Sequence, residues 1–184
     1  PDATDEHTAI ILEDAIRKSE EDDAHLMTMA VTATESQESI ASATSAAIDE
    51  TLYNDGTPES LLLVSAGNVD NNDGVGYPDY LWNNSVNDPA QSWNALTVGA
   101  FTKKIVISDV EYEGRQIVAP HGGVSPFSRT SRLWDNNMLI KPEILMEGGN
   151  AYWDGGGYFQ CHDDLMLVTT DARDYCTFSA FNAT

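Results

Sequence analysis

The sequence has few basic residues, few cysteines and no long apolar segment, and each scarcity excludes a class of protein. Nine lysines and arginines stand against 30 aspartates and glutamates, which gives a formal net charge of −21. A surface this acidic repels nucleic acid and anionic membranes, so we expect no nucleic-acid partner. No apolar run approaches the roughly 18 residues of a membrane-spanning helix, so we expect no membrane partner either.

The two cysteines, Cys161 and Cys176, are too few to set up a disulfide framework in a chain of 184 residues. The sequence leaves a disulfide between them open, because geometry decides that question. Two reduced thiols are favoured, and they are typical of a reducing compartment such as the cytoplasm. The strong acidity itself is typical of a solubility trait or of salt adaptation rather than of a binding site.

The length suits one domain with a sizeable core, and no repeat or low-complexity tract marks a boundary within residues 1–184. The first residue is proline rather than methionine, which indicates a processed chain or a piece of a longer protein.

Apolar patterns predict helices that alternate with strands. One helix, with Thr8 as its N-cap, should stop near Ser19, where an acidic cluster meets the negative end of the helix dipole. A second helix is predicted over residues 38–53. Five apolar runs are predicted as strands of one largely parallel sheet: Leu26–Val31, Leu61–Ala66, Ala95–Gly99, Ile144–Met146 and Leu165–Thr169. This order predicts an α/β fold with a doubly wound sheet, and two helices should leave one sheet face partly bare.

The segment Ile105–Val118 alternates polar and apolar residues and is rich in β-branched side chains. This pattern predicts a peripheral β-hairpin that turns at Glu113–Arg115.

The strand Leu61–Ala66 ends on small residues and presents Asn68 just beyond its carboxyl end. In open α/β sheets, ligands bind at this edge. A neutral amide donor placed there suits an oxyanion that exists only in a transition state. The alternative, which the local sequence leaves open, is that Asn68 only caps a turn from strand to loop.

Four motifs follow one another in the order found in the subtilisin-like serine proteases (subtilases, the S8 peptidase family). They are Ser65-Ala66-Gly67-Asn68, which resembles the oxyanion-hole segment, Asn94–Ala100, similar to N-A-(I/L)-x-V-G-A, Val124–Ser131, similar to the F-S turn, and Ile140–Leu145, similar to K-P-(D/E)-(I/V). The resemblance implies a three-layer subtilisin-like fold and a serine endopeptidase that acts through an acyl-enzyme. It implies a peptide or protein substrate and no cofactor.

The resemblance also implies which residues act. Asn68 would be the oxyanion donor. Two segments would form opposite walls of the S1 cleft and pair with the extended substrate backbone: Ala30, Val31 and Thr32, and Ser65, Ala66 and Gly67. Thr32 stands where the family usually has glycine, and its branched side chain predicts a cleft of altered shape. Glu147-Gly148 replaces the common A-P-G, and this resembles a bacterial branch.

The resemblance covers only the middle of the family's catalytic domain. The family's catalytic Asp and His belong to segments before the strand Leu26–Val31, and D-(S/T)-G and H-G-T are absent from residues 1–25. The ending Phe181–Thr184 resembles the approach to the nucleophilic Ser. We therefore expect the remainder of the catalytic domain as a partner, an incomplete fold, and no activity from these residues alone. The alternative is a catalytically inactive, subtilase-like module that binds peptides.

Four other candidate sites are predicted to be structural. The loop Val69–Pro89 is rich in oxygen ligands but lacks the spacing of a calcium loop. His121 has no acid partner at a recognisable spacing. Asp154–Gly157 lacks the lysine of a phosphate-binding loop, and the adjacent residues His162–Asp164 rarely form a metal site alone. We therefore expect no metal site.

Overall fold

The computed structural model describes residues 3–33, 41–53, 60–69, 76–131, 134, 139–156, 159–169 and 177–179. Its α-helices are α1 (Ala3–Glu21) and α2 (Ala43–Tyr53). Its strands are β1 (Leu26–Met29), β2 (Leu61–Ser65), β3 (Leu96–Phe101), β4 (Ile144–Glu147), β5 (Tyr152–Trp153), β6 (Phe159–Gln160), β7 (Leu167–Thr169) and β8 (Thr177–Ser179). Short 3-10 helices are η2 (Asp79–Asn83), η3 (Val110–Tyr112) and η4 (Asp163–Leu165). Within this described part, no helix combines the length and the apolar character needed to cross a membrane.

The main sheet has four parallel strands in the order β1-β2-β3-β4. Leu63 of β2 lies level with Leu96 of β3, and Val98 of β3 lies level with Ile144 of β4. The predicted α/β fold with a largely parallel sheet is confirmed, and four of the five predicted strands lie in this sheet. β2 therefore lies inside the sheet, with a neighbour on each side.

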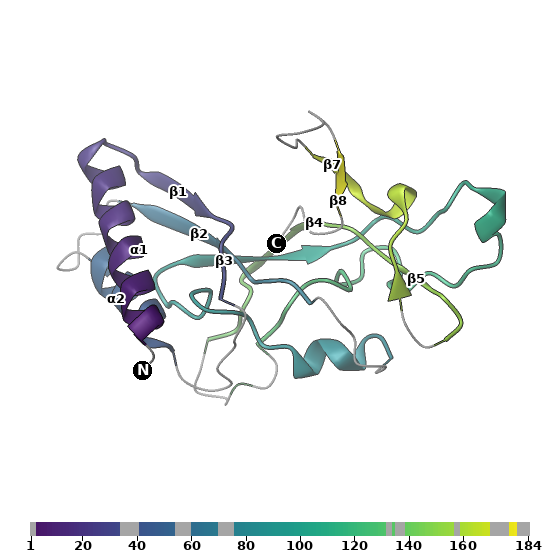
Figure 1. Ribbon diagram of the computed structural model, residues 1–184, viewed down its shortest axis with the longest axis horizontal. Coiled ribbons are helices and arrows are strands. Elements are labelled where there is room, and N and C mark those ends of the chain that lie inside the picture. The colour runs from purple at the N-terminus through teal and green to yellow at the C-terminus, as the bar shows by residue number, and fades with distance from the viewer. Residues whose placement is uncertain are drawn as a thin grey trace.

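Both α-helices pack on one face of the sheet. Ile16 of α1 and Ile48 of α2 share a buried cluster with Leu62 and Val64 of β2. Figure 1 shows the two helices side by side at one end of the molecule, and they contact each other directly. Alternate residues of β2 point to this face, as the two-residue period of a strand requires.

The other sheet face is partly bare, as predicted. The strand register places Leu61, Val98, Ile144 and Met146 on the face opposite the helices. Leu61 is 43% exposed and Met146 is 57% exposed. Parallel sheets normally bury both faces, so this one is half covered by the residues that the structure describes.

The fifth predicted strand does not join the main sheet. β7 pairs antiparallel with β8 in a separate two-stranded sheet. Leu165, just before it, is fully buried, and Met166 packs on a satellite cluster around Val118 and Phe127. The apolar run therefore predicted correctly that the segment is buried, but it did not predict which sheet the strand joins.

The predicted hairpin over Ile105–Val118 is also wrong, because this segment forms no strand. It contains the 3-10 helix η3, which the Asp109 carboxylate caps by accepting a bond from the Glu111 N–H at 3.0 Å. Gly114 does turn the chain with a φ of 82°. Val110 is 81% exposed, so the alternating pattern of this segment does not mark the buried face of a strand.

Neither helix begins where predicted, whereas α2 ends at Tyr53 as predicted. α1 begins before Thr8 and continues beyond Ser19 to Glu21. Lys18 pairs with acidic side chains one turn ahead, including Asp22 at 3.0 Å, and so offsets their repulsion by the helix dipole. α2 begins only at Ala43, because the Ser42 hydroxyl caps it by accepting the Ser45 N–H at 2.9 Å.

Candidate functional site

The segment that leaves β2 runs into the interior beside a second loop. Ser65, Ala66 and Gly67 are all buried. The Ala66 N–H donates to the Val98 carbonyl at 2.8 Å, and the Ala66 carbonyl accepts the Asn87 N–H at 3.0 Å. These two bonds extend the sheet by one residue beyond β2 and attach the loop that contains Asn87 to it.

Gly67 is required by its surroundings. Its φ is 92°, a conformation that other residues rarely adopt. A Cβ built at this position would lie 2.7 Å from the Asn87 Nδ2. The glycine of the predicted motif therefore allows a tight turn and the close approach of Asn87.

Asn68, the predicted oxyanion donor, lies half-buried directly after this turn. It forms an antiparallel β-bridge with Ser128. Arg129 Nε donates to the Asn68 carbonyl at 2.7 Å, and the next residue, Val69, donates its N–H to the Phe127 carbonyl at 2.8 Å. Two of the four predicted motifs, far apart in sequence, thus lie against each other at the carboxyl end of β2.

The segment that holds Asn68 is itself firmly anchored. The Ser128 hydroxyl accepts the Ala100 N–H at 2.9 Å, and the Ser125 hydroxyl donates to the Gly149 carbonyl at 2.8 Å. Tyr80 donates its hydroxyl proton to the Pro126 carbonyl at 2.7 Å. Burial raises the pKa of Tyr80 well above its usual value, and the neighbouring Tyr77 raises it further, so this hydroxyl stays a neutral donor.

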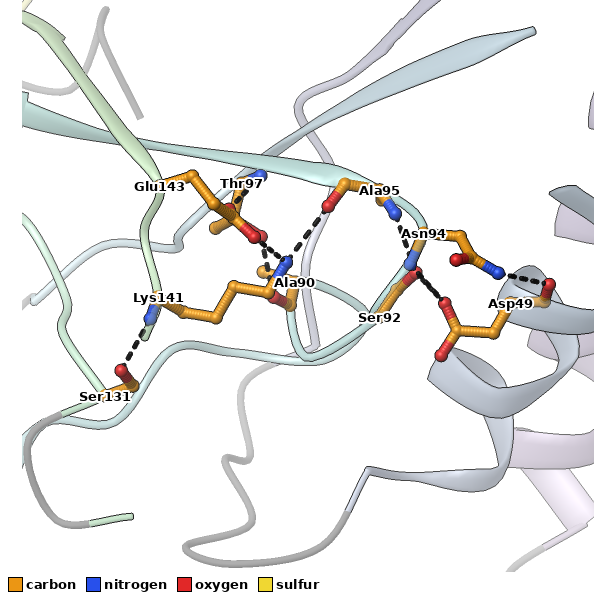
Figure 2. Close-up of polar contacts among 9 residues, drawn as sticks. All are labelled: Asp49, Ala90, Ser92, Asn94, Ala95, Thr97, Ser131, Lys141 and Glu143. Carbon is orange, nitrogen blue, oxygen red and sulfur yellow. Dashed lines mark hydrogen bonds and ion pairs between the residues drawn. The ribbon is translucent and has the colours of Figure 1, made fainter. Parts of the chain in front are cut away.

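The other two motifs meet at the amino ends of β3 and β4, where Figure 2 shows a network around Lys141 and Glu143. The Lys141 side chain is fully buried, and its Nζ lies 2.5 Å from Glu143 Oε1 and 3.0 Å from the Ala95 carbonyl oxygen. The second carboxylate oxygen of Glu143 accepts the Thr97 N–H at 2.8 Å. A buried ammonium needs such partners, so this lysine is structural.

A second carboxylate connects α2 to the start of β3. Asp49 Oδ1 accepts from the Ser92 hydroxyl at 2.5 Å and from the Asn94 N–H at 2.7 Å, and the Asp49 carbonyl accepts the Asn94 side-chain amide at 2.9 Å. The asparagine of the Asn94–Ala100 motif therefore positions β3 against a helix.

The predicted substrate residues are only partly brought together. Ala30 and Ser65 line one depression of about 180 Å³ at the end of the strands, together with Leu63 and Val98. Val31 and Thr32 turn away and line a separate pocket of about 260 Å³ with Asp88 and Pro89. The cause is a bond of 2.8 Å from the Ala33 N–H to the Asp88 carbonyl. Thr32 therefore lies beside the second loop.

Sequence reasoning did not single out Arg129, Ser85 or Asn87, which surround Asn68 and Gly67. Arg129 also donates from Nη1 to the Ser85 carbonyl at 3.1 Å. The Ser85 hydroxyl and the Asn87 Oδ1 are buried and have no hydrogen-bond partner among the described residues. Arg129 lies inside a quoted motif, but only the tertiary contact reveals its role.

Two of the four candidate sites judged structural from sequence, His121 and His162–Asp164, lie entirely within the described residues. His121 is exposed, and His162 Nδ1 accepts the Asp164 N–H at 3.1 Å while its ring packs 4.7 Å from that of Tyr112. A bond from the Ser108 N–H lowers the pKa of Asp164. Among the described residues, no group of three or more His, Cys, Asp or Glu side chains is placed to hold a metal ion.

Several sequence expectations fall partly or wholly outside the described residues. These are the oxygen-rich part of the Val69–Pro89 loop at positions 70–75, the first residues of the helix predicted over 38–53, position 157 of Asp154–Gly157, Cys176 and the ending Phe181–Thr184. Cys161 is exposed at the surface.

Comparison with known proteins gives three findings. A model of the subtilase family (peptidase S8) matches residues 2–182. No curated protein matches the chain. Among solved structures, a lanthipeptide protease is similar with a TM-score of 0.48 and 16% sequence identity, over 88% of this chain and 39% of that one. The chain thus spans well under half the length of that protease.

Proposed function

The chain belongs to the subtilase family, and from this premise we propose that the intact protein is a serine-type endopeptidase. It hydrolyses peptide bonds in a peptide or protein substrate through an acyl-enzyme intermediate. Residues 1–184 supply the oxyanion donor and part of the substrate cleft, and the remainder of the catalytic domain supplies the nucleophile and its base.

Asn68 carries the chemistry that this chain contributes. When a nucleophile attacks the scissile carbonyl, its oxygen gains negative charge that the ground state lacks. The Asn68 side-chain amide donates a hydrogen bond to that oxygen. Its position directly after β2, with its own backbone held by Ser128 and Arg129, favours a donor that is fixed before the reaction begins.

The substrate backbone lies extended between the two segments that follow β1 and β2. Ala30 and Ser65, which line the same depression, contact the residue on the acyl side of the scissile bond. Val31 and Thr32 form the outer wall, which continues from Ala30, and Ala66 and Gly67 belong with Ser65 to the opposite wall. Because Thr32 lies against Asp88 and Pro89, the outer wall is displaced toward that loop.

The observation that carries this proposal is the placement of Asn68 beyond the carboxyl end of an inner parallel strand, the edge where open α/β sheets bind ligands. An inactive peptide-binding module of the same family is the second candidate. The displaced outer wall departs from a cleft with two close walls, and this departure favours the inactive binding module.

The decisive experiment measures kcat, KM and melting temperature for Asn68→Ala in the intact protein. Loss of one oxyanion donor should lower kcat by about 10²–10³ with KM little changed. Asn68→Asp should be worse than Asn68→Ala, because a carboxylate repels the oxyanion. If Asn68 only caps a turn, the variant keeps its kcat and loses about 1 kcal/mol of unfolding free energy.

A fluorophosphonate probe, which labels activated serines, separates the enzyme from the inactive module. The intact protein should be labelled at one serine, and residues 1–184 purified alone should not be labelled. Stoichiometric labelling of the isolated chain would contradict the division of roles proposed here, and an unlabelled intact protein would favour the binding module.

A further inference from the structure

We propose that Arg129 is a positioning residue for the oxyanion donor, acting through the backbone carbonyl of Asn68. This inference rests on the proposed role of Asn68. Arg129 does not touch the reacting atoms; it holds the peptide unit from which the donor side chain projects.

The geometry shows one peptide unit held at both of its polar ends. The Asn68 carbonyl accepts from Arg129 Nε at 2.7 Å, and the N–H of the same peptide unit, which belongs to Val69, donates to the Phe127 carbonyl at 2.8 Å. With both groups bonded to one segment, the ψ of Asn68 cannot change without breaking a hydrogen bond. β2 has ended at Ser65, so beyond the single Asn68–Ser128 bridge no regular strand ladder among the described residues fixes this unit.

The guanidinium spans two separate chain segments. Its Nη1 donates to the Ser85 carbonyl at 3.1 Å while its Nε donates to Asn68. A planar, rigid fork suits two carbonyls at a fixed separation, whereas the single ammonium of lysine is a flexible point charge. Arg129 thus ties the donor residue to the loop that begins at Ser85.

Small displacements of an oxyanion donor strongly lower the rate of the reaction that it assists. An oxyanion donor acts at about 2.7–3.1 Å from the developing charge, and a shift of about 1 Å costs on the order of 10² in rate. Loss of the Arg129 contact frees the Asn68 carbonyl to reorient, and the side-chain amide moves with it. We therefore expect a loss in kcat rather than in substrate binding.

The test is a double-mutant cycle in the intact protein. Arg129→Met removes the fork, and Asn68→Ala removes the donor through which the fork acts. Alone, Arg129→Met should lower kcat at least about 10-fold with KM little changed; in the Asn68→Ala background it should lower kcat less than about 2-fold, since coupled sites are non-additive. Affinity for a peptide aldehyde, which forms an oxyanion with the nucleophile, should fall in parallel with kcat.

Two further variants make the cycle specific. Arg129→Lys keeps the charge but not the fork, so it should show most of the loss in kcat and a smaller loss of melting temperature. Thr130→Val is the matched control: it removes a hydrogen bond of 3.0 Å from the same segment to the Leu81 carbonyl, without touching Asn68. Its kcat should stay within about 2-fold of the wild type, because the lost bond holds neither polar end of the Asn68–Val69 peptide unit.

The possible failures are distinguishable. An equal kcat loss from Arg129→Met in both backgrounds would mean that Arg129 is a general structural clamp, and the inference alone would be wrong. Wild-type kcat in Arg129→Lys would overturn the role of the fork in the same way. Wild-type kcat in Asn68→Ala would overturn the proposed function, and the role of Arg129 with it.

Discussion

Two polar regions flank the inner strands of the sheet, and they differ in how completely their buried groups are paired. At the amino ends of β3 and β4, the fully buried Lys141 ammonium is bonded to Glu143 and to the Ala95 carbonyl. Beyond the carboxyl end of β2, the Ser85 hydroxyl and the Asn87 Oδ1 are buried without a partner in the part of the chain that the structure describes. Buried polar groups are nearly always paired, so these two atoms depart from the rule, as does the Trp134 indole N–H in the core cluster around Ile48, whereas the Lys141–Glu143 network follows it.

This difference separates stability from function. A satisfied network fixes one arrangement of strands, and breaking it costs unfolding free energy. Unpaired groups and a residue at positive φ, such as Gly67, lower the stability of the resting protein. They are typical of sites where a bound ligand or a transition state supplies the missing hydrogen-bond partners. Substitutions at the amino ends should therefore change stability alone, and those beyond β2 should change activity as well.

The largest expected stability effect is at the amino ends. Glu143→Gln removes the charge that faces a fully buried ammonium, so the free energy of unfolding should fall by about 3 kcal/mol. The folded fraction should keep its kcat, because the network lies away from Asn68. Urea denaturation with activity measured below the transition tests both statements.

The matched control for this prediction removes the buried charge itself. Lys141→Met leaves a partly exposed carboxylate that water can solvate, and the double variant Lys141→Met/Glu143→Gln leaves no charge at all. The double variant should be more stable than Glu143→Gln alone, because an unpaired buried charge is the main cost. If the double variant were the least stable of the three, the ion pair would contribute more than its desolvation costs.

An intermediate effect is expected at the tight turn before the donor. In Gly67→Ala, an alanine must adopt a positive φ and its Cβ must lie against the Asn87 side chain. The substitution should therefore lower the free energy of unfolding by about 2 kcal/mol. It should also lower kcat, because Asn68 is the next residue. Adding Asn87→Ala should recover part of the stability, since it removes the closest atom. If Gly67→Ala lost stability but kept its kcat, the region beyond β2 would affect stability alone, like the region at the amino ends.

The smallest effect concerns Tyr80, which anchors the segment that holds Asn68. Tyr80→Phe removes one hydrogen bond to the Pro126 carbonyl and should cost about 1 kcal/mol at neutral pH. The folded-state pKa of Tyr80 is raised above the unfolded value of about 10, so the unfolded chain loses its proton first. Its stabilising contribution is present below that pH and is lost as the pH rises above it.

The measurement for this prediction is thermal unfolding from pH 7 to pH 11. The wild type should lose stability above about pH 10 more steeply than Tyr80→Phe, so the difference between the two should narrow. A difference that stays constant over this range would mean that Tyr80 ionises equally in the folded and unfolded states.

Local sequence patterns were sufficient to predict the parallel α/β sheet, its four main strands and the position of Asn68 after β2. Those features follow from local patterns: apolar runs that need burial, and small residues that end a strand. Ser65-Ala66-Gly67-Asn68 also carried the family resemblance, because a tight turn and a close backbone approach restrict the residue types that fit.

Which distant segments meet could be learned only from the folded chain. The sheet membership of Leu167–Thr169, the turning away of Thr32 and the bond from Arg129 to the Asn68 carbonyl all depend on partners far away in the chain. Apolar period and motif spacing report how a residue relates to its neighbours in sequence, whereas hydrogen bonds between loops depend on where the whole chain brings them. For that reason the strand that ends before Asn68 could be predicted from the sequence, and the arginine that bonds to the Asn68 carbonyl could not.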